Sequence, residues 1–218
     1  KIKYCSAGTV EFLFDDKTDK FWFLEVNTRL QVEHPVTEEV TGIDLVAEQI
    51  KIARGDELEF AQDDIDWHGH AIEARLYAED PGNNFLPEIG TLHAYDTSLA
   101  SEVRWDSGVE EGSVIGTDFD PMLSKVISWA PNRIDAANKL ARGLERAHMG
   151  GVVTNRQFLI SCLRNESFIS GNTPYSLAPS IEELETIDRQ NPITLLVSLG
   201  SIMPSSVTML LATRPSDI

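Results

Sequence analysis

The chain has 218 residues, of which 42% are hydrophobic and 24% are charged. These proportions are typical of a soluble globular protein rather than a disordered one, and the length allows one or two domains. The formal net charge of −17 argues against nucleic acid as a partner, because phosphates would be repelled. Cys5 and Cys162 stand at no metal-binding or redox spacing, which favours a reducing compartment, and we expect the cytoplasm.

A β-hairpin is predicted near the start of the chain, from residues 9–14 and 21–27. Both runs are rich in aromatic and β-branched residues, and a polar stretch separates them. This apolar richness predicts a buried sheet. A register that pairs Glu11 with Glu25 would bring their Cβ atoms to about 5 Å, and strict alternation would put Phe23 on the same face as Glu25.

Two carboxylates in opposing positions suggest a metal site. Like charges directly opposite each other destabilise a sheet unless a cation lies between them. Asn27, two residues after Glu25, would add a neutral oxygen. Such hard oxygen ligands suit Mg2+ or Mn2+ bridging substrate phosphates. The alternative is an exposed strand on which Glu11 and Glu25 are simply solvated.

The segment after the hairpin is dense in groups that bind a small planar anion. Arg29 offers a bidentate guanidinium, Gln31 an amide and Val32 a backbone N–H. Glu33 could accept a proton from the bound anion. The alternate positions of Arg29, Gln31 and Glu33 predict a strand or extended loop, which Pro35 ends. The alternative is a polar loop in which Arg29 pairs with Glu33.

A helix is predicted after this segment, with Asp44 as its N-cap and Gly55 at its end. Its apolar face is expected to contain Leu45, Val46, Gln49, Ile50 and Ala53. An acidic linker or loop follows.

From residue 69 the pattern changes to short strands, expected at residues 70–77, 90–95, 102–105, 113–116 and 122–129. Two helices follow. The first is predicted over residues 133–149, with Leu140 and Leu144 on its buried side. The second begins at Thr154, with Thr154 and Gln157 as a capping box, and buries Leu159. Residues 190–213 carry no charge, but proline, glycine and serine interrupt them too often for a membrane span of about 20 apolar residues, so no membrane contact is expected.

These motifs resemble those of one family. Glu11 and the run from Phe23 to Glu38 resemble the ATP-grasp signature of biotin carboxylases. The likeness continues in residues 42–46, 69–81, 85–87, 118–125 and 151–155, and covers about residues 6–177. Residues 104–112 and 118–125 are most similar to the alpha subunit of bacterial acetyl- and propionyl-CoA carboxylases.

The resemblance implies an α+β fold with two parts and a tail. Residues 1–56 would be the C-terminal part of an ATP-grasp domain. Residues 67–178 would be a biotin carboxylase C-terminal domain of short antiparallel strands and two helices. Residues 179–218 show no likeness to the family.

The implied reaction is the ATP- and bicarbonate-dependent carboxylation of biotin through carboxyphosphate. The resemblance implies that Glu11 and Glu25 hold Mg2+ or Mn2+ on the ATP phosphates, with Asn27 as a further metal ligand. It implies that bicarbonate is bound by Arg29, Gln31 and the Val32 backbone, and that Glu33 is the general base. It also implies that Arg75 stabilises the biotin enolate. Arg75 would share a strand face with Glu73 and Tyr77, so a purely structural ion pair is the alternative for this residue.

The resemblance also implies partners and a missing part. The biotin itself would be carried by a biotinyl carrier domain that is not part of this chain, a carboxyltransferase subunit would use it, and a homodimer is expected. The chain opens without Met, directly on a strand pattern, and no glycine-rich phosphate loop is present. We therefore expect a fragment with little activity of its own.

Other interpretations remain open. A urea or pyruvate carboxylase fragment would share the same motifs, and a non-catalytic remnant would only dock with partner subunits. A carbamoyl phosphate synthetase is disfavoured because the block at residues 69–81 is not expected there.

Overall fold

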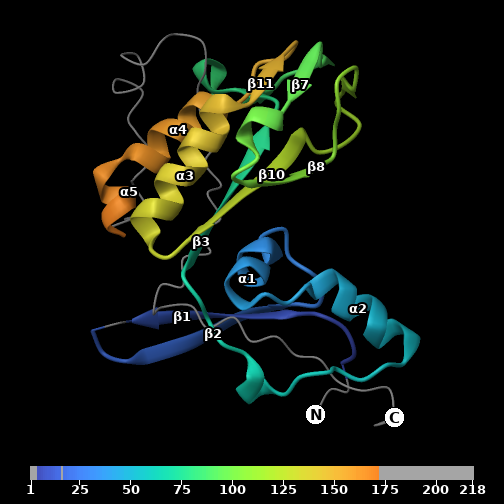
Figure 1. The fold of residues 1–218 in the computed structure, drawn as a ribbon, viewed down its shortest axis with the longest axis vertical. Helices are drawn as coiled ribbons and strands as arrows, with labels where there is room; N and C mark the ends of the chain where they lie inside the picture. The colour runs from blue at the N-terminus through green and yellow to red at the C-terminus, as the bar shows by residue number, and fades with distance from the viewer. Residues whose placement is uncertain (1–3, 16, 172–218) are drawn as a thin grey trace. The chain divides into compact units, whose positions relative to one another are not determined.

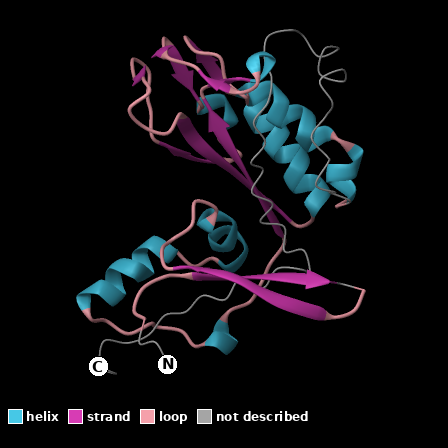
Figure 2. Cartoon of the chain, turned by 180° about the vertical axis from the view of Figure 1, so that it is seen from behind, coloured by secondary structure: helices cyan, strands magenta, loops and turns pink. Residues whose placement is uncertain are grey.

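The computed structural model describes residues 4–15 and 17–171, so the tail proposed at 179–218 lies outside the described residues. The described residues up to His68 form one compact unit and those from Gly69 onward a second, and each is described by itself (Figures 1 and 2). None of the helices in these two ranges is long and apolar enough to cross a membrane.

The first unit consists of a hairpin and two helices (Figure 1). Its elements are β1 (Thr9–Asp15), β2 (Lys20–Asn27), α1 (His34–Thr41), α2 (Leu45–Arg54) and the 3-10 turn η1 (Gln62–Asp64). β1 and β2 pair antiparallel, and the register that puts Glu11 opposite Glu25 is confirmed. The predicted hairpin therefore exists with the pairing that the carboxylate argument requires.

A β-bulge changes which side chains share a face of this hairpin. The register shifts after Glu11, so that Phe12 pairs with Phe23 and Leu24 has no partner on β1. The ring of Phe12 contacts those of Phe21 and Phe23 edge-on, at centroid distances of 5.6 and 6.1 Å. The prediction that Phe23 shares a face with Glu25 is wrong, because the extra residue of a bulge breaks strict alternation.

The expectation of a buried sheet is also not met within the described residues. Every residue of β2 from Lys20 to Val26 is exposed, including Phe21 at 67% and Phe23 at 58%. The many apolar residues of a strand indicate that its surface tends to be covered, but they do not indicate which segment or partner covers it.

The two helices of the first unit follow local signals unequally well. Asp44 caps α2 by accepting a hydrogen bond from the Ala47 N–H at 2.8 Å, and Gly55 ends the helix in a left-handed conformation, both as predicted. The predicted apolar face is only partly right, since Leu45 is buried but Val46 and Ile50 are exposed. Helix α1 was not expected at all.

The second unit is a three-stranded antiparallel sheet, β3-β10-β8, with three helices and several short strand pairs (Figure 2). Its strands are β3 (His70–Tyr77), β4 (Glu79–Asp80), β5 (Leu86–Pro87), β6 (Gly90–Thr91), β7 (Ala94–Asp96), β8 (Arg104–Ser107), β9 (Val114–Ile115), β10 (Met122–Ala130) and β11 (His148–Gly150). Its helices are α3 (Arg133–Arg146), α4 (Arg156–Arg164) and α5 (Glu166–Ser170), with the 3-10 turns η2 (Pro81–Asn83) and η3 (Ser98–Ala100). The predicted α+β class is confirmed.

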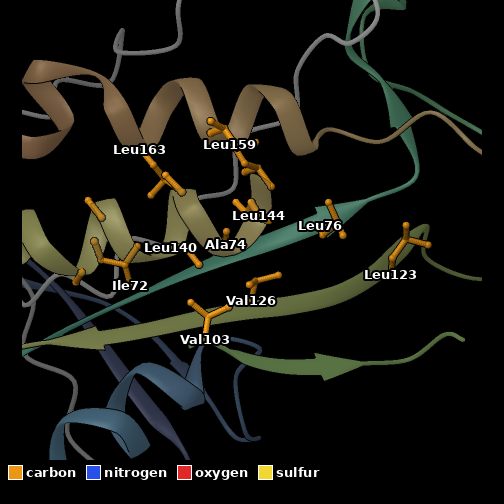
Figure 3. Close-up of a cluster of buried hydrophobic side chains, with 14 of the residues drawn as sticks. Ile72, Ala74, Leu76, Val103, Leu123, Val126, Leu140, Leu144, Leu159 and Leu163 are labelled. Carbon is orange, nitrogen blue, oxygen red and sulfur yellow. The ribbon is translucent and has the colours of Figure 1, made fainter. Parts of the chain in front are cut away.

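One core holds this unit together, between the sheet and the helices α3 and α4. Figure 3 shows side chains from β3, β10, α3 and α4 meeting in a single layer. The fully buried members include Leu76, Val126, Leu140, Leu144, Leu159 and Leu163. The helix faces predicted from hydrophobic periodicity are confirmed. Because β3 buries one face here, its opposite face is left for polar side chains.

Two helix boundaries differ from the prediction. Helix α3 ends at Arg146, and residues 148–150 form β11, which pairs with β7. Helix α4 begins after Asn155, whose side chain bonds to β3 instead of capping the helix, so the predicted capping box of Thr154 and Gln157 is wrong.

Replacing Gly151 with alanine should destabilise the second unit. Gly151 has φ +115°, and a Cβ at this position would overlap the Thr91 carbonyl oxygen. We expect Gly151→Ala to lower the free energy of unfolding by about 2 kcal/mol or more, because backbone and space both exclude a side chain. Gly116→Ala is the control, since nothing lies within 4 Å of that Cβ. Urea denaturation measures both, and equal losses would contradict the prediction.

The stability of the second unit should decrease as the pH decreases, because His70 takes up a proton less readily in the folded chain than in the unfolded chain. Burial lowers the pKa of His70, and the Arg133 guanidinium, with Nη1 3.4 Å from Nε2, lowers it further. The unfolded chain then binds the proton more readily, so stability is lost as the pH falls below about 6.5. We expect a shallower loss of unfolding free energy between pH of about 7.5 and about 5.5 for His70→Asn than for the unchanged chain. The exposed control His93→Asn should keep the original slope.

Candidate active site

The two carboxylates predicted to face each other across the hairpin are joined by one amide. The Asn27 Nδ2 group donates to Glu11 Oε1 at 2.8 Å and to Glu25 Oε1 at 3.2 Å. The Gln31 Nε2 group also donates to Glu11 Oε1, at 3.0 Å. The structure therefore brings together four of the predicted site residues, three from the hairpin and one from the segment after it.

This arrangement fits a divalent cation. Two negatively charged oxygens converge on one amide nitrogen, which supplies the positive end of a dipole between them. Rotating the Asn27 amide by half a turn would present its oxygen instead, giving two carboxylates and one neutral oxygen. Within residues 4–15 and 17–171, no three His, Cys, Asp or Glu side chains cluster as metal ligands. A small acidic ligand set of this kind is what Mg2+ uses when substrate phosphates and water complete its coordination.

The residues predicted to bind an anion do not form a strand. The chain bends at Arg29, and Val32 and Glu33 lie in a turn that leads into α1. The exposed Arg29 donates from Nη1 to the Leu30 carbonyl at 3.3 Å. The predicted extended conformation from residue 29 to 33 is wrong because Pro35 lies in the first helical turn, where its fixed φ favours a helix start.

The turn fixes the backbone around Glu33. Glu33 is the N-cap residue of α1, and its carbonyl accepts from the Val36 N–H at 3.1 Å. The Gln31 carbonyl accepts from the His34 N–H at 3.3 Å and lies 2.8 Å from His34 Nδ1. Residues 31–34 are therefore held locally, which places Gln31, Val32 and Glu33 on one short, defined loop.

Arg75 lies in the second unit, on the face of β3 opposite the core. Its Nε is 4.0 Å from Oε1 of the fully buried Glu73, two residues earlier. Burial raises the pKa of Tyr77, and the Asp120 charge raises it further, while the Arg75 hydrogen bond opposes both. The predicted neighbours of Arg75, Glu73 and Tyr77, are thus confirmed.

Neighbouring strands continue this charged face. Lys125 on β10 is directly opposite Arg75, and it pairs with Asp106 on β8 at 3.4 Å. Burial opposes ionisation of Asp106, but Arg104, at 2.8 Å, and Lys125 hold the pKa of that carboxyl below its ordinary value. The like charges of Arg75 and Lys125 are thereby partly balanced.

The backbone around Arg75 is held by a residue that was not among the predicted site residues. The fully buried Asn155 accepts from the Tyr77 N–H at 3.0 Å and donates to the Arg75 carbonyl at 3.2 Å. Its own N–H donates to the Tyr77 carbonyl at 3.1 Å. The only sequence signal was the block at residues 151–155, in which we assigned the capping role to Thr154. A buried amide that bonds strand backbone on both sides fixes the position of Arg75.

Two protein-family models match the chain, one in each of its two compact units. Residues 73–177 match the biotin carboxylase C-terminal domain. Residues 1–61 match the ATP-binding domain of the carbamoyl-phosphate synthase L chain. Together the two matches cover residues 1–61 and 73–177. The chain belongs to the biotin carboxylase family, and the interpretation as a carbamoyl phosphate synthetase is excluded by the C-terminal match.

Curated relatives place the chain with acyl-CoA carboxylase alpha subunits. It is 41% identical over 194 residues to the mitochondrial methylcrotonoyl-CoA carboxylase subunit alpha of Glycine max, covering 89% of this chain and 26% of that protein. It is 48% identical over 173 residues to the mitochondrial propionyl-CoA carboxylase alpha chain of Homo sapiens, covering 78% and 24%. Biotin carboxylase 2 of Bacillus subtilis is 45% identical over 171 residues, covering 78% and 38%. The chain thus spans about a quarter of the length of the first two relatives.

Solved structures confirm the fold. The biotin carboxylase domain dimer of Hydrogenobacter thermophilus 2-oxoglutarate carboxylase, in complex with MgADP, ADP and bicarbonate, has a TM-score of 0.76 and 38% identity. The match covers 84% of this chain and 39% of that one. The urea carboxylase of Kluyveromyces lactis has a TM-score of 0.72 and 40% identity, over 82% of this chain and 15% of that one.

Removing one carboxylate should stabilise the chain when no metal is present. In a chelator, we expect Glu25→Gln to raise the free energy of unfolding by about 0.5 kcal/mol, because it removes a like-charge pair while keeping the acceptor for Asn27. The exposed Asp56→Asn is the matched control and should change little. Urea denaturation in a chelating buffer measures both variants. A lower stability for Glu25→Gln would show that the two charges do not repel each other.

Proposed function

We propose that this chain provides the metal, bicarbonate and biotin-enolate residues of a biotin carboxylase that carboxylates biotin from ATP and bicarbonate through carboxyphosphate. The observation that supports it most is the Glu11 and Glu25 pair, aligned across one hairpin and joined by Asn27. A structural role alone would not need two opposed carboxylates on an exposed hairpin. The acceptor would be biotin on a carrier domain outside this chain.

Glu11, Glu25 and Asn27 would hold Mg2+ or Mn2+ on the ATP phosphates. The cation would neutralise phosphate charge as the γ-phosphoryl group is transferred. When it binds, the Asn27 amide would turn its oxygen inward, which releases Glu11 from the bond to this amide. The amide of Gln31 would follow, becoming available to bicarbonate instead of Glu11. Metal binding and formation of the bicarbonate site would therefore be linked through Glu11.

Bicarbonate would lie at the loop of residues 29–33. The Arg29 guanidinium and the Val32 N–H would bind its oxygens together with Gln31. Glu33 would take the bicarbonate proton, so that a bicarbonate oxygen attacks the γ-phosphorus while the bond to the ADP oxygen breaks. The products are ADP and carboxyphosphate, which then separates into phosphate and CO2. The turn at residues 31–34 supports this role because it holds the base and the anion donors on one loop.

Arg75 would act on the second substrate. Phosphate released together with CO2 would take the proton from the ring nitrogen of biotin. A fixed guanidinium beside the ureido oxygen would stabilise the enolate that forms, and the ring nitrogen of this enolate would attack CO2. The Asn155 hydrogen bonds to the Arg75 and Tyr77 backbone support this role by fixing the strand that carries the guanidinium.

The partners would be a biotinyl carrier domain and a carboxyltransferase subunit, with a second copy of the chain completing a homodimer. The dimer described for the Hydrogenobacter thermophilus domain supports the proposed homodimer. Cys5 and Cys162 are both free thiols, which supports a reducing compartment such as the cytoplasm. Because urea and pyruvate carboxylases are structurally as similar, their reactions are the alternatives for the complete protein, and a docking remnant without turnover is the third.

The role of Glu33 can be tested in a chimera with Biotin carboxylase 2 of Bacillus subtilis, in which this chain replaces its matched region. We expect bicarbonate-dependent ATP cleavage in the chimera. Glu33→Gln should lower kcat by roughly 10²- to 10⁴-fold, since a general base is lost, while the ATP dissociation constant stays within about twofold. The exposed Glu57→Gln is the control and should keep full turnover.

A loss of ATP binding together with turnover in Glu33→Gln would mean that Glu33 only supports the loop. The isolated 218 residues should show no bicarbonate-dependent ATP cleavage, because the residues assigned here hold metal, bicarbonate and biotin but not adenine. Turnover by the isolated chain comparable to that of the Bacillus subtilis enzyme would refute the fragment interpretation.

A further inference from the structure

Helix α1 holds two largely buried polar side chains that the proposed reaction does not use. His34 and Glu38 lie one turn apart on this helix, and their side chains are 13% and 8% exposed. The distance between His34 Nε2 and Glu38 Oε1 is 3.9 Å. Burying polar groups lowers stability unless they form hydrogen bonds, so the bonds that these two side chains make indicate what they hold in place.

The His34 ring contacts the loop that precedes it. Its Nδ1 atom lies 2.8 Å from the carbonyl oxygen of Gln31. A carbonyl oxygen can only accept a hydrogen bond, so Nδ1 must carry a proton and donate it. The same carbonyl already accepts from the His34 N–H at 3.3 Å, which closes the turn. The bond from the ring is therefore an addition to the turn and fixes the direction of this carbonyl more tightly.

The direction of the Gln31 carbonyl also sets the direction of a neighbouring donor. The carbonyl of Gln31 and the N–H of Val32 belong to one peptide group, which is planar and trans, so the two point in opposite directions. Any rotation of this group moves both together. By holding the Gln31 carbonyl, the His34 ring therefore fixes the direction of the Val32 N–H without contacting it.

The carboxylate of Glu38 ties this arrangement to the next helix. Its Oε1 atom accepts from the N–H of Leu45 at 2.9 Å, and Leu45 is the first residue of α2. The first N–H groups of a helix have no partner within the helix and favour a negative charge nearby. Leu45 is itself buried, at 5% exposure. The carboxylate is thus fixed between the start of α2 and the ring of His34, although 3.9 Å is too long for a hydrogen bond to the ring.

We propose that His34 is a positioning residue for bicarbonate, whose ring orients the peptide group between Gln31 and Val32 and so aims the Val32 N–H at the bound anion. The identity of the anion rests on the function proposed above. The bond from Nδ1 to the Gln31 carbonyl does not rest on it. An imidazole suits this role because its planar ring holds one donor in a fixed direction while the other nitrogen faces Glu38.

Nitrogen NMR of the isotopically labelled histidine ring tests the placement of His34 in the full chain. The spectrum of His34→Asn identifies the signal. We expect a proton on Nδ1 of His34 at a pH of about 8. This proton should exchange with water more slowly than the ring protons of the exposed His93. A ring with a proton on Nε2 alone would overturn the proposal, whatever the chain catalyses.

Kinetics test the effect on bicarbonate, in the chimera with Biotin carboxylase 2 of Bacillus subtilis described above. His34→Leu removes the donor, and we expect it to raise the KM for bicarbonate roughly tenfold, with the KM for ATP within about twofold. His34→Asn keeps a donor close to the position of Nδ1 and should return the KM for bicarbonate to within about threefold of the original. The exposed His93→Leu is the matched control and should leave both KM values unchanged.

The two KM values separate positioning from a general loss of structure. An equal rise of both KM values in His34→Leu, or an unchanged KM for bicarbonate, would overturn the proposal. No rescue by His34→Asn would also overturn it, since the donor would then not be what matters. A chimera that cleaves no ATP even before substitution would contradict the proposed function instead, and the NMR result would then decide on the placement of His34.

Discussion

Repulsion between two carboxylates is the constraint on which the first unit depends. Glu11 and Glu25 lie opposite each other across the hairpin, and among the described residues the amides of Asn27 and Gln31 donate hydrogen bonds to them. The repulsion between the two carboxylates lowers the stability of the folded chain, and a divalent cation between them would replace this repulsion with attraction. Stability and the proposed activity therefore make opposite demands on the same pair.

The bulge after Glu11 resolves a second conflict in the same hairpin. Two strands of strict alternation would place Phe23 beside Glu25, so that apolar and ionised side chains would share one face. The extra residue, Leu24, turns the aromatic side chains toward Phe12 and leaves the carboxylates with Asn27. Alternation alone could not have predicted this, because a bulge is set by pairing across the strands and has no signature in one strand.

Features set by interactions between residues close in the sequence were predicted correctly, and features set by distant residues were not. β3 was predicted with its observed ends, and the Asp44 and Gly55 caps of α2 were found, because hydrophobic periodicity and caps act within a few residues. Helix α1 was missed since Pro35 was taken as a breaker and not as a first-turn residue. The register that pairs Glu11 with Glu25 is confirmed, but it does not follow from the turn, because the pairs next to the turn reach it only through the bulge. The exposure of β2 was not predicted, because covering depends on distant segments.

Arg75 shows the same limit at the level of function. Its neighbours Glu73 and Tyr77 followed from strand alternation, but the residue that fixes its backbone comes from the start of α4, some 80 positions later. Asn155 can hold two points on β3 because α4 and β3 share one core cluster, which includes Leu159 and Leu76. Core packing thus carries the positional information for the polar face, and a cavity made in this core would displace Arg75 before it removed any charge. The apolar layer therefore holds in place the guanidinium for which we propose the enolate-binding role.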